Sequence, residues 1–350
     1  MGKDDYLKRK IFPLLLALVL SLTACIPAFA ASNKVKHYDT VTVLGDSIAA
    51  GFSLPDYVKK SGNGENLVSK QRIEGSYAAI VADAVGAKKL NMLAQPGFRT
   101  EEVHMMLDPS YTSDRAKNNQ LGQQARIVGG AKNAPDYSEE SLAKQRDEYR
   151  SAVKSSDLVI LDIGANDAMM SAMGAARNLV SFGSAGENPL ETFWNSVNEE
   201  GLSEAVSDAS KDLQTVVQTP RLLKALKTAI YGATSDYVEH YNAIVRLIYE
   251  LNPNTTVVTV GNYNPFHQWK TLSGDTVGSY LQPYYDYLNN TKKAAGADHK
   301  GHYYYVDVSD TPLITDSLGT LIKNGKFDAH PTEEGHRYMA SQILAALSEN

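Results

Sequence analysis

Five short apolar runs alternate along the chain with longer segments in which apolar residues recur at helical spacing. The runs cover residues 41–44, 89–93, 158–163, 256–260 and 303–306. Near-continuous apolar runs of this length are typical of strands that are covered on both faces. We therefore predict five strands of a parallel sheet.

Helical spacing appears between these runs. Helices are predicted over residues 77–85, 141–154 and 236–251, and a last helix is predicted to begin at residues 332–334. Strands that alternate with helices form a doubly wound α/β sheet with helices on both faces. Two longer stretches, at about 108–138 and 168–235, are predicted to be insertions within a single domain of residues 31–350, because neither has a core of its own.

The first thirty residues have the layout of a secretory signal peptide. Basic residues precede an apolar run at 11–22, and Ala28-Phe29-Ala30 follows with small residues at both key positions. The run is too short to span a bilayer comfortably. We therefore expect an exported bacterial protein that begins at Ala31 and has no transmembrane segment in its mature chain.

The only cysteine, Cys25, lies in this segment. The stretch Leu22-Thr23-Ala24-Cys25 also resembles a bacterial lipobox, and this alternative would make Cys25 a lipid anchor at the cell surface. Cleavage after Ala30 would leave no cysteine, which excludes disulfides, thiolate nucleophiles and Cys-ligated zinc. The formal net charge of −6 and the lack of a basic block argue against a nucleic-acid partner.

A serine stands just past the first predicted strand, in the turn Gly45-Asp46-Ser47. In open α/β sheets, ligands bind beyond the carboxyl ends of the strands. The turn is not the G-x-S-x-G elbow of the α/β-hydrolases, because no glycine lies two residues beyond Ser47. Glycine, aspartate and serine are all turn formers, so this motif alone is a weak signal.

Three further turns follow later strands and carry Gly97, Asn166 and His330. An imidazole at His330 can act as the base that a serine nucleophile needs, and Asp328 can orient it. Gly97 can bring a backbone N–H close to a tetrahedral oxyanion, and Asn166 can add a side-chain amide. Together with Ser47, these residues predict a site for acyl transfer.

In this order the four turns resemble the blocks of the GDSL or SGNH hydrolases. The serine block reads GDSI at 45–48, the glycine block is Gly97, the asparagine block reads GAND at 164–167, and the histidine block is His330. The resemblance covers about residues 40–348. It implies a flavodoxin-like α/β/α sandwich with a five-stranded parallel sheet, no metal or other cofactor, and hydrolysis of esters or thioesters through an acyl-serine intermediate. It also implies an oxyanion hole built from the backbone amides of Ser47 and Gly97 and the side chain of Asn166.

The histidine block departs from the family pattern. The family commonly places its aspartate three residues before the histidine, whereas Asp328 lies two before His330. Residues two apart in an extended segment point to the same side, so we predict that Asp328 still orients His330. A backbone carbonyl, Asp310 or Asp316 are the alternatives.

The resulting expectation is a secreted serine hydrolase of the lipase or esterase type, with a small-molecule or polysaccharide ester as substrate. A carbohydrate O-acetyl esterase that acts on cell-wall or plant polysaccharide is the alternative within the enzyme class. A non-catalytic glycan-binding protein on the same fold is the alternative from another class. The four intact blocks argue against it, because a binding protein would have no use for all of them.

Overall fold

The computed structural model describes residues 35–62, 66–117, 137–167, 169, 228, 231–232, 234–267, 277–314, 317–319 and 328–348. The predicted signal peptide, Cys25, most of the two predicted insertions and Asp316 lie outside these residues. Contacts divide the chain into two units, His37–Ala346 and a second one made of Met1–Lys36 with Leu347–Asn350. Within the second unit, Val35 and Ser348 form an antiparallel bridge. All the helices and strands of the described residues belong to the first unit.

One sheet of five parallel strands forms the centre of this unit, in the order β2-β1-β3-β4-β5. The strands are β1 (Thr40–Gly45), β2 (Lys89–Met92), β3 (Leu158–Asp162), β4 (Thr256–Val260) and β5 (Tyr303–Val306). Each predicted run forms a strand, so the predicted α/β class and its five-stranded parallel sheet are confirmed. This strand order is that of flavodoxin-like sheets. Because β1 lies between β2 and β3, the turns after these three strands meet at one edge.

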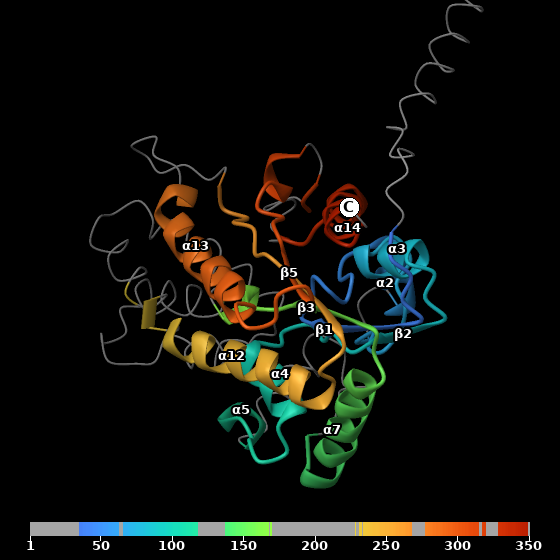
Figure 1. Ribbon diagram of the computed structural model, residues 1–350. Helices are drawn as coiled ribbons and strands as arrows, with labels where there is room; N and C mark the ends of the chain where they lie inside the picture. The colour runs from blue at the N-terminus through green and yellow to red at the C-terminus, as the bar shows by residue number, and fades with distance from the viewer. Residues whose placement is uncertain are drawn as a thin grey trace, which may run out of the picture. The chain divides into compact units, whose positions relative to one another are not determined.

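Helices cover both faces of the sheet (Figure 1). They are α2 (Pro55–Lys60), α3 (Tyr77–Ala84), α4 (Thr100–Leu107), α5 (Asp114–Lys117), α7 (Glu139–Lys154), α12 (Thr234–Leu251), α13 (Val277–Ala295), the 3₁₀ helix η1 (Thr311–Leu313) and α14 (Glu333–Ala346). Helices α3 and α14 pack together on one face, and α4, α7 and α12 on the other, with α13 beside α12. Right-handed crossovers require this split, because the step from β1 to β2 runs opposite to the later steps.

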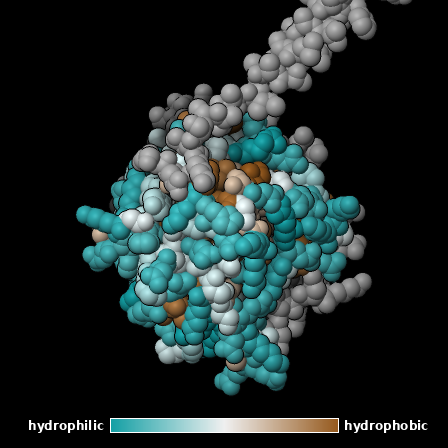
Figure 2. All heavy atoms as spheres, turned by 45° about the vertical axis from the view of Figure 1, so that its right-hand side comes forward, coloured by the Kyte–Doolittle hydropathy of each residue, from teal (hydrophilic) through white to brown (hydrophobic). Residues whose placement is uncertain are grey.

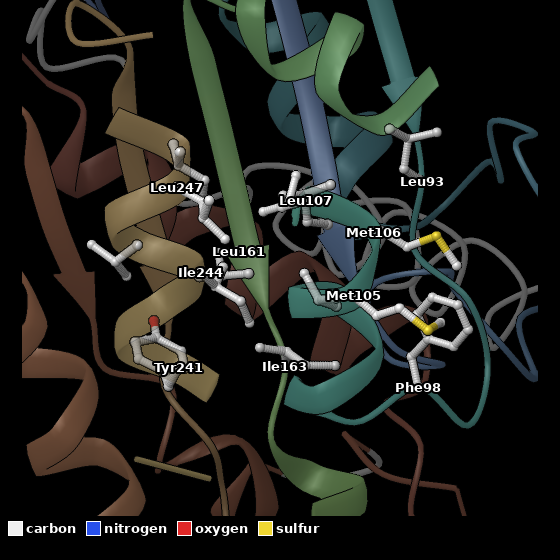
Figure 3. Packing of buried hydrophobic residues seen from close by; sticks show 14 of the residues in the cluster. Leu93, Phe98, Met105, Met106, Leu107, Leu161, Ile163, Tyr241, Ile244 and Leu247 are labelled. Carbon is white, nitrogen blue, oxygen red and sulfur yellow. The ribbon is translucent and has the colours of Figure 1, made fainter. Parts of the chain in front are cut away.

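The main core lies between the sheet and the layer of α4, α7, α12 and α13. Helix α12 contributes Tyr237, Tyr241, Ile244 and Ile248, whose spacing places them on one buried face. Figure 3 shows side chains of α12 and α4 meeting over β3. The helices predicted at 77–85, 141–154 and 236–251 are therefore present as α3, α7 and α12, with ends shifted by at most two residues.

Little apolar surface is exposed on the face of the molecule that Figure 2 shows. On the face drawn in Figure 2 most residues are hydrophilic, and the largest group of apolar residues lies near the top of the view. Among the residues described, none of the helices combines the length and apolar character that a bilayer span requires.

Candidate active site

The turn that carries Ser47 is built by the two residues before it. A side chain at Gly45 would collide with the carbonyl oxygen of Asp162 on β3, so only glycine fits where the two strands end. The backbone N–H of Asp46 donates to that same oxygen at 3.2 Å. The carboxylate of Asp46 accepts from the backbone N–H of Ile48 at 2.9 Å, which closes a tight turn. Ser47 is thereby presented at the carboxyl edge of the sheet.

His330 lies between Ser47 and Asp328. Its Nε2 is 2.8 Å from the hydroxyl oxygen of Ser47, and its Nδ1 is 2.7 Å from a carboxylate oxygen of Asp328. A carboxylate only accepts, so Nδ1 carries the proton and Nε2 is left to accept from the serine hydroxyl. Burial alone would raise the pKa of Asp328, but hydrogen bonding and the charge of His330 outweigh it and lower that pKa.

The short spacing between Asp328 and His330 works through a local turn. The same carboxylate oxygen that accepts from the His330 ring also accepts from the His330 backbone N–H, at 3.0 Å. The hydroxyl of Tyr263 donates to the carbonyl of Ala329 at 2.7 Å, and the N–H of Gly319 donates to the carbonyl of His330 at 2.7 Å. Together these four hydrogen bonds hold the segment in place.

The alternative partners of His330 are placed differently. Asp310 is exposed and stands at the N-cap of η1, and Asp316 lies outside the described residues. Of these carboxylates, Asp328 is the one whose bond to the imidazole is described. The catalytic role of that bond stays a prediction.

An aromatic side chain that the sequence did not point to packs on the imidazole. The ring of Phe52 lies 4.7 Å from that of His330 and 5.0 Å from that of Tyr57, measured between centroids. The backbone N–H of Phe52 donates to the carbonyl of Ser47 at 3.0 Å. One turn thus supplies both the serine and the ring that supports its neighbouring base.

Gly97 and Asn166 reach the same edge from β2 and β3. The N–H of Gln95 donates to the carbonyl of Gly45 at 3.0 Å, which carries the chain after β2 alongside the serine turn. Gly97 follows with φ of +82°, a conformation that favours glycine. The amide of Asn166 donates to the carbonyl of Phe98, next to Gly97, at 2.9 Å.

The donors that an oxyanion would need remain available. Among the described residues, the backbone N–H groups of Ser47 and Gly97 have no hydrogen-bond acceptor. The Asn166 side chain uses one of its two amide hydrogens for Phe98, and the other has no acceptor within the part of the chain that the structure describes. One edge of the sheet therefore carries the Ser47 hydroxyl, the His330 imidazole, the Asp328 carboxylate and three hydrogen-bond donors.

The model of the GDSL-like lipase/acylhydrolase family matches residues 43–338. The chain belongs to this family. No curated protein matches the sequence.

Solved structures with some likeness to this GDSL-family acylhydrolase include two Streptomyces enzymes. An extracellular lipase from Streptomyces rimosus has 19% identity and a TM-score of 0.49, over 88% of this chain and 99% of that one. Phospholipase A1 from Streptomyces albidoflavus NA297 has 17% identity and a TM-score of 0.45, over 89% and 98%. A family two carbohydrate esterase from Clostridium thermocellum has 15% identity and a TM-score of 0.39, over 89% and 64%.

Beneath the serine turn of this acylhydrolase lies a layer of buried polar groups that sequence reasoning missed. The hydroxyl of Tyr77 donates to the carboxylate of Asp162 at 2.8 Å, and the ammonium of Lys292 donates to the carbonyl of Val260 at 2.6 Å. Burial raises the pKa of Asp162 to about 6 and lowers that of Lys292 to about 8. Burial, with the charge of Asp162 next to it, raises the pKa of Asp46 as well. Lys292 therefore supplies the positive charge that these crowded carboxylates require.

Proposed function

We propose that this protein is an exported hydrolase of carboxylic esters that uses Ser47 as its nucleophile. The observation that carries the proposal is the continuous path of hydrogen bonds from Asp328 through His330 to Ser47. Membership of the GDSL-like lipase/acylhydrolase family supports it.

Acylation begins with proton transfer from the Ser47 hydroxyl to Nε2 of His330. The hydroxyl oxygen attacks the ester carbonyl and a tetrahedral oxyanion forms. Asp328 stabilises the imidazolium that results, because a carboxylate next to Nδ1–H favours the charged ring. The imidazolium then gives its proton to the leaving alkoxide, the carbon–oxygen bond to the alcohol breaks, and an acyl-serine remains.

The oxyanion is stabilised by the N–H groups of Ser47 and Gly97 and by the free amide hydrogen of Asn166. These donors come from three separate turns that the sheet holds in place. Fixed donors need no reorganisation as negative charge develops, and the loss of one commonly costs about 10²–10³ in kcat.

Deacylation repeats the chemistry with water. His330 takes a proton from the water molecule, the hydroxide attacks the acyl carbonyl, and the Ser47 oxygen leaves with the proton that His330 returns. The carboxylic acid departs and the enzyme is restored.

A fluorophosphonate probe tests the nucleophile. The native protein should be labelled covalently and should hydrolyse p-nitrophenyl acetate. Ser47→Ala should keep its fold, lose labelling, and lower kcat by on the order of 10⁴-fold or more. An alanine variant that still forms the covalent adduct would overturn the assignment.

The acyl and alcohol groups of the substrate are addressed by a second assay. We propose a lipase or esterase, for which p-nitrophenyl esters of some chain length should be turned over faster than acetylated xylan. Faster release of acetate from xylan would instead assign the site to carbohydrate deacetylation.

Export is proposed from the N-terminal segment, with cleavage after Ala30. N-terminal sequencing of protein from its native host should begin at Ala31. A lipidated Cys25, released only by detergent, would contradict this and place the enzyme on the membrane.

A further inference from the structure

The side chains of Thr100 and Asp167 connect the turn that carries Gly97 (the glycine turn) with the turn that carries Asn166 (the asparagine turn). The hydroxyl of Thr100 donates to one carboxylate oxygen of Asp167 at 2.5 Å, and the backbone N–H of Thr100 donates to the other at 3.1 Å. Thr100 is the first residue of α4, two residues after Phe98. Asp167 directly follows Asn166. The carboxylate, which follows β3, therefore bonds to the first residue of α4, the helix that follows the glycine turn.

The hydrogen bonds between Thr100 and Asp167 are buried, and they involve a carboxylate. Thr100 is fully buried and Asp167 is 8% exposed. Burial raises the pKa of Asp167 to about 6, against the opposing effects of Arg99 and of both Thr100 donors. A carboxylate in such a place needs its hydrogen bonds, because an unsatisfied buried charge is costly. The two hydrogen bonds from Thr100 therefore help to hold Asp167 in place.

Asn166 and Asp167, which are consecutive after β3, form hydrogen bonds with two residues that closely follow Gly97. Asn166 donates to the carbonyl of Phe98, and Asp167 accepts from Thr100. The far side of the turn is anchored by α4, whose Met105 lies near Phe98 in the core (Figure 3). Gly97, which directly precedes Phe98, is therefore held relative to Asn166 by these contacts.

We propose that Thr100 and Asp167 are positioning residues that set the spacing between two oxyanion donors, the Gly97 N–H and the Asn166 amide. The inference rests on the proposed function, since it concerns the same site. Oxyanion donors act within a narrow window of about 2.7–3.1 Å. Displacement by about 1 Å can cost as much as 10²-fold in rate, even when the altered residue lies away from the chemistry.

Thr100→Val tests the hydroxyl with little change in shape. It should lower kcat by roughly 10- to 100-fold and leave KM nearly unchanged, because the oxyanion forms in the transition state and is absent from the bound substrate. Thr100→Ser keeps the hydroxyl and should retain kcat within about threefold of the native value. Equal losses in both variants would overturn the proposal, because the hydroxyl would then make no difference.

Thr42→Val is the matched control. Thr42 is a fully buried threonine on β1 whose hydroxyl bonds to the hydroxyl of Ser156 and accepts from Asn91. The same chemical change at this position should lower the melting temperature and leave kcat unaltered. If Thr100→Val behaves in the same way, its role is structural only and the proposal fails.

A double variant connects the effect to the oxyanion. In the background of Asn166→Ala, Thr100→Val should cost clearly less than it costs in the native protein, because one of the two donors it aligns is gone. Full additivity would contradict the proposal. If Thr100→Val does not fold, Asp167→Asn takes its place, with the same expected loss of kcat and the same comparison in the Asn166→Ala background.

The proposed function is tested in the same series by the native protein. A native protein that neither hydrolyses esters nor reacts with the fluorophosphonate would refute the function. Native activity combined with an unchanged kcat in Thr100→Val and Asp167→Asn would refute only the positioning role.

Discussion

Two histidines six residues apart, His330 and His336, occupy opposite kinds of environment. His330 is 23% exposed in its side chain and has a polar side chain at each ring nitrogen. His336 is fully buried, stacks on the ring of Tyr77, and accepts one hydrogen bond at Nδ1 from the backbone N–H of Tyr77. Its Nε2 has no partner among the described residues.

The difference shows what an imidazole needs in order to move protons. Burial, with a smaller contribution from the charge of His330, lowers the pKa of His336 to about 3, so that ring stays neutral. His330 has a carboxylate at one nitrogen and a hydroxyl at the other, which allows it to gain and release a proton. We therefore expect substitutions around His330 to change rate, and substitutions around His336 to change stability.

The largest effect is expected from His330→Ala. Without the base, kcat should fall on the order of 10⁴-fold or more, while the melting temperature changes little because the ring is partly exposed. Steady-state kinetics with p-nitrophenyl acetate and a thermal melt measure both quantities. Activity within about 100-fold of the native enzyme would break the distinction between the two histidines.

Asp328→Asn tests the carboxylate at Nδ1 of His330, a partner that His336 does not have among the described residues. An amide at this position favours the wrong imidazole tautomer, so kcat should drop by up to about 10⁴-fold. Asp310→Asn, a change at an exposed carboxylate near η1, is the control and should leave kcat unaltered. A loss smaller than roughly tenfold at Asp328 would mean that Asp328 does not orient the ring and that a Ser–His dyad acts alone.

Asn166→Ala, at the same edge of the sheet as His330, is also expected to lower the rate, but by less than the changes at His330 and Asp328. The loss of one oxyanion donor should lower kcat by about 10²–10³ with little change in KM. Asn289→Ala is the control, because Asn289 is also buried but bonds to the backbone of Asn262. That change should reduce stability and leave the rate intact. A raised KM with native kcat in Asn166→Ala would make Asn166 a residue for ground-state binding.

Much of the fold could be predicted because it depends on apolar pattern. The five runs became the five strands, and the spacing of Tyr237, Tyr241 and Ile244 became the buried face of α12. Helix α4 was missed, although Glu101 and Glu102 in its first turn are a recognisable start signal. The turns that carry Ser47, Gly97 and Asn166 could be found because each closely follows a strand, whereas His330 lies well beyond the end of β5, after η1.

The buried polar layer could not be predicted in the same way. Lys292 and Lys293 are adjacent lysines, and such a pair normally indicates a solvated face, yet Lys292 is fully buried against the end of β4. Nothing in the local sequence of Tyr77 or Asp162 signals that they meet, since they are brought together only when α3 packs on the sheet. Such pairs are properties of the tertiary structure.

The smallest effect is expected from His336→Leu, and its size should depend on pH. The variant leaves the Tyr77 N–H without its acceptor, which costs about 1–3 kcal/mol at pH 7.5, while kcat stays close to native. Below pH 6.5 the unfolded chain binds a proton at His336 that the folded protein, with a pKa of about 3, does not bind. This histidine therefore contributes stability that is fully present above pH 6.5 and is lost as the pH falls.

The leucine variant has no such proton to take up. At pH 5 the stability difference between native protein and variant should therefore be smaller than at pH 7.5, by roughly 2 kcal/mol. Other titrating groups, including Asp328, are common to both proteins and cancel in this difference. Urea unfolding at the two pH values measures it. A difference that stays constant would show that His336 binds a proton equally readily in the folded protein and in the unfolded chain, and a large loss of kcat would place His336 in the working site beside His330.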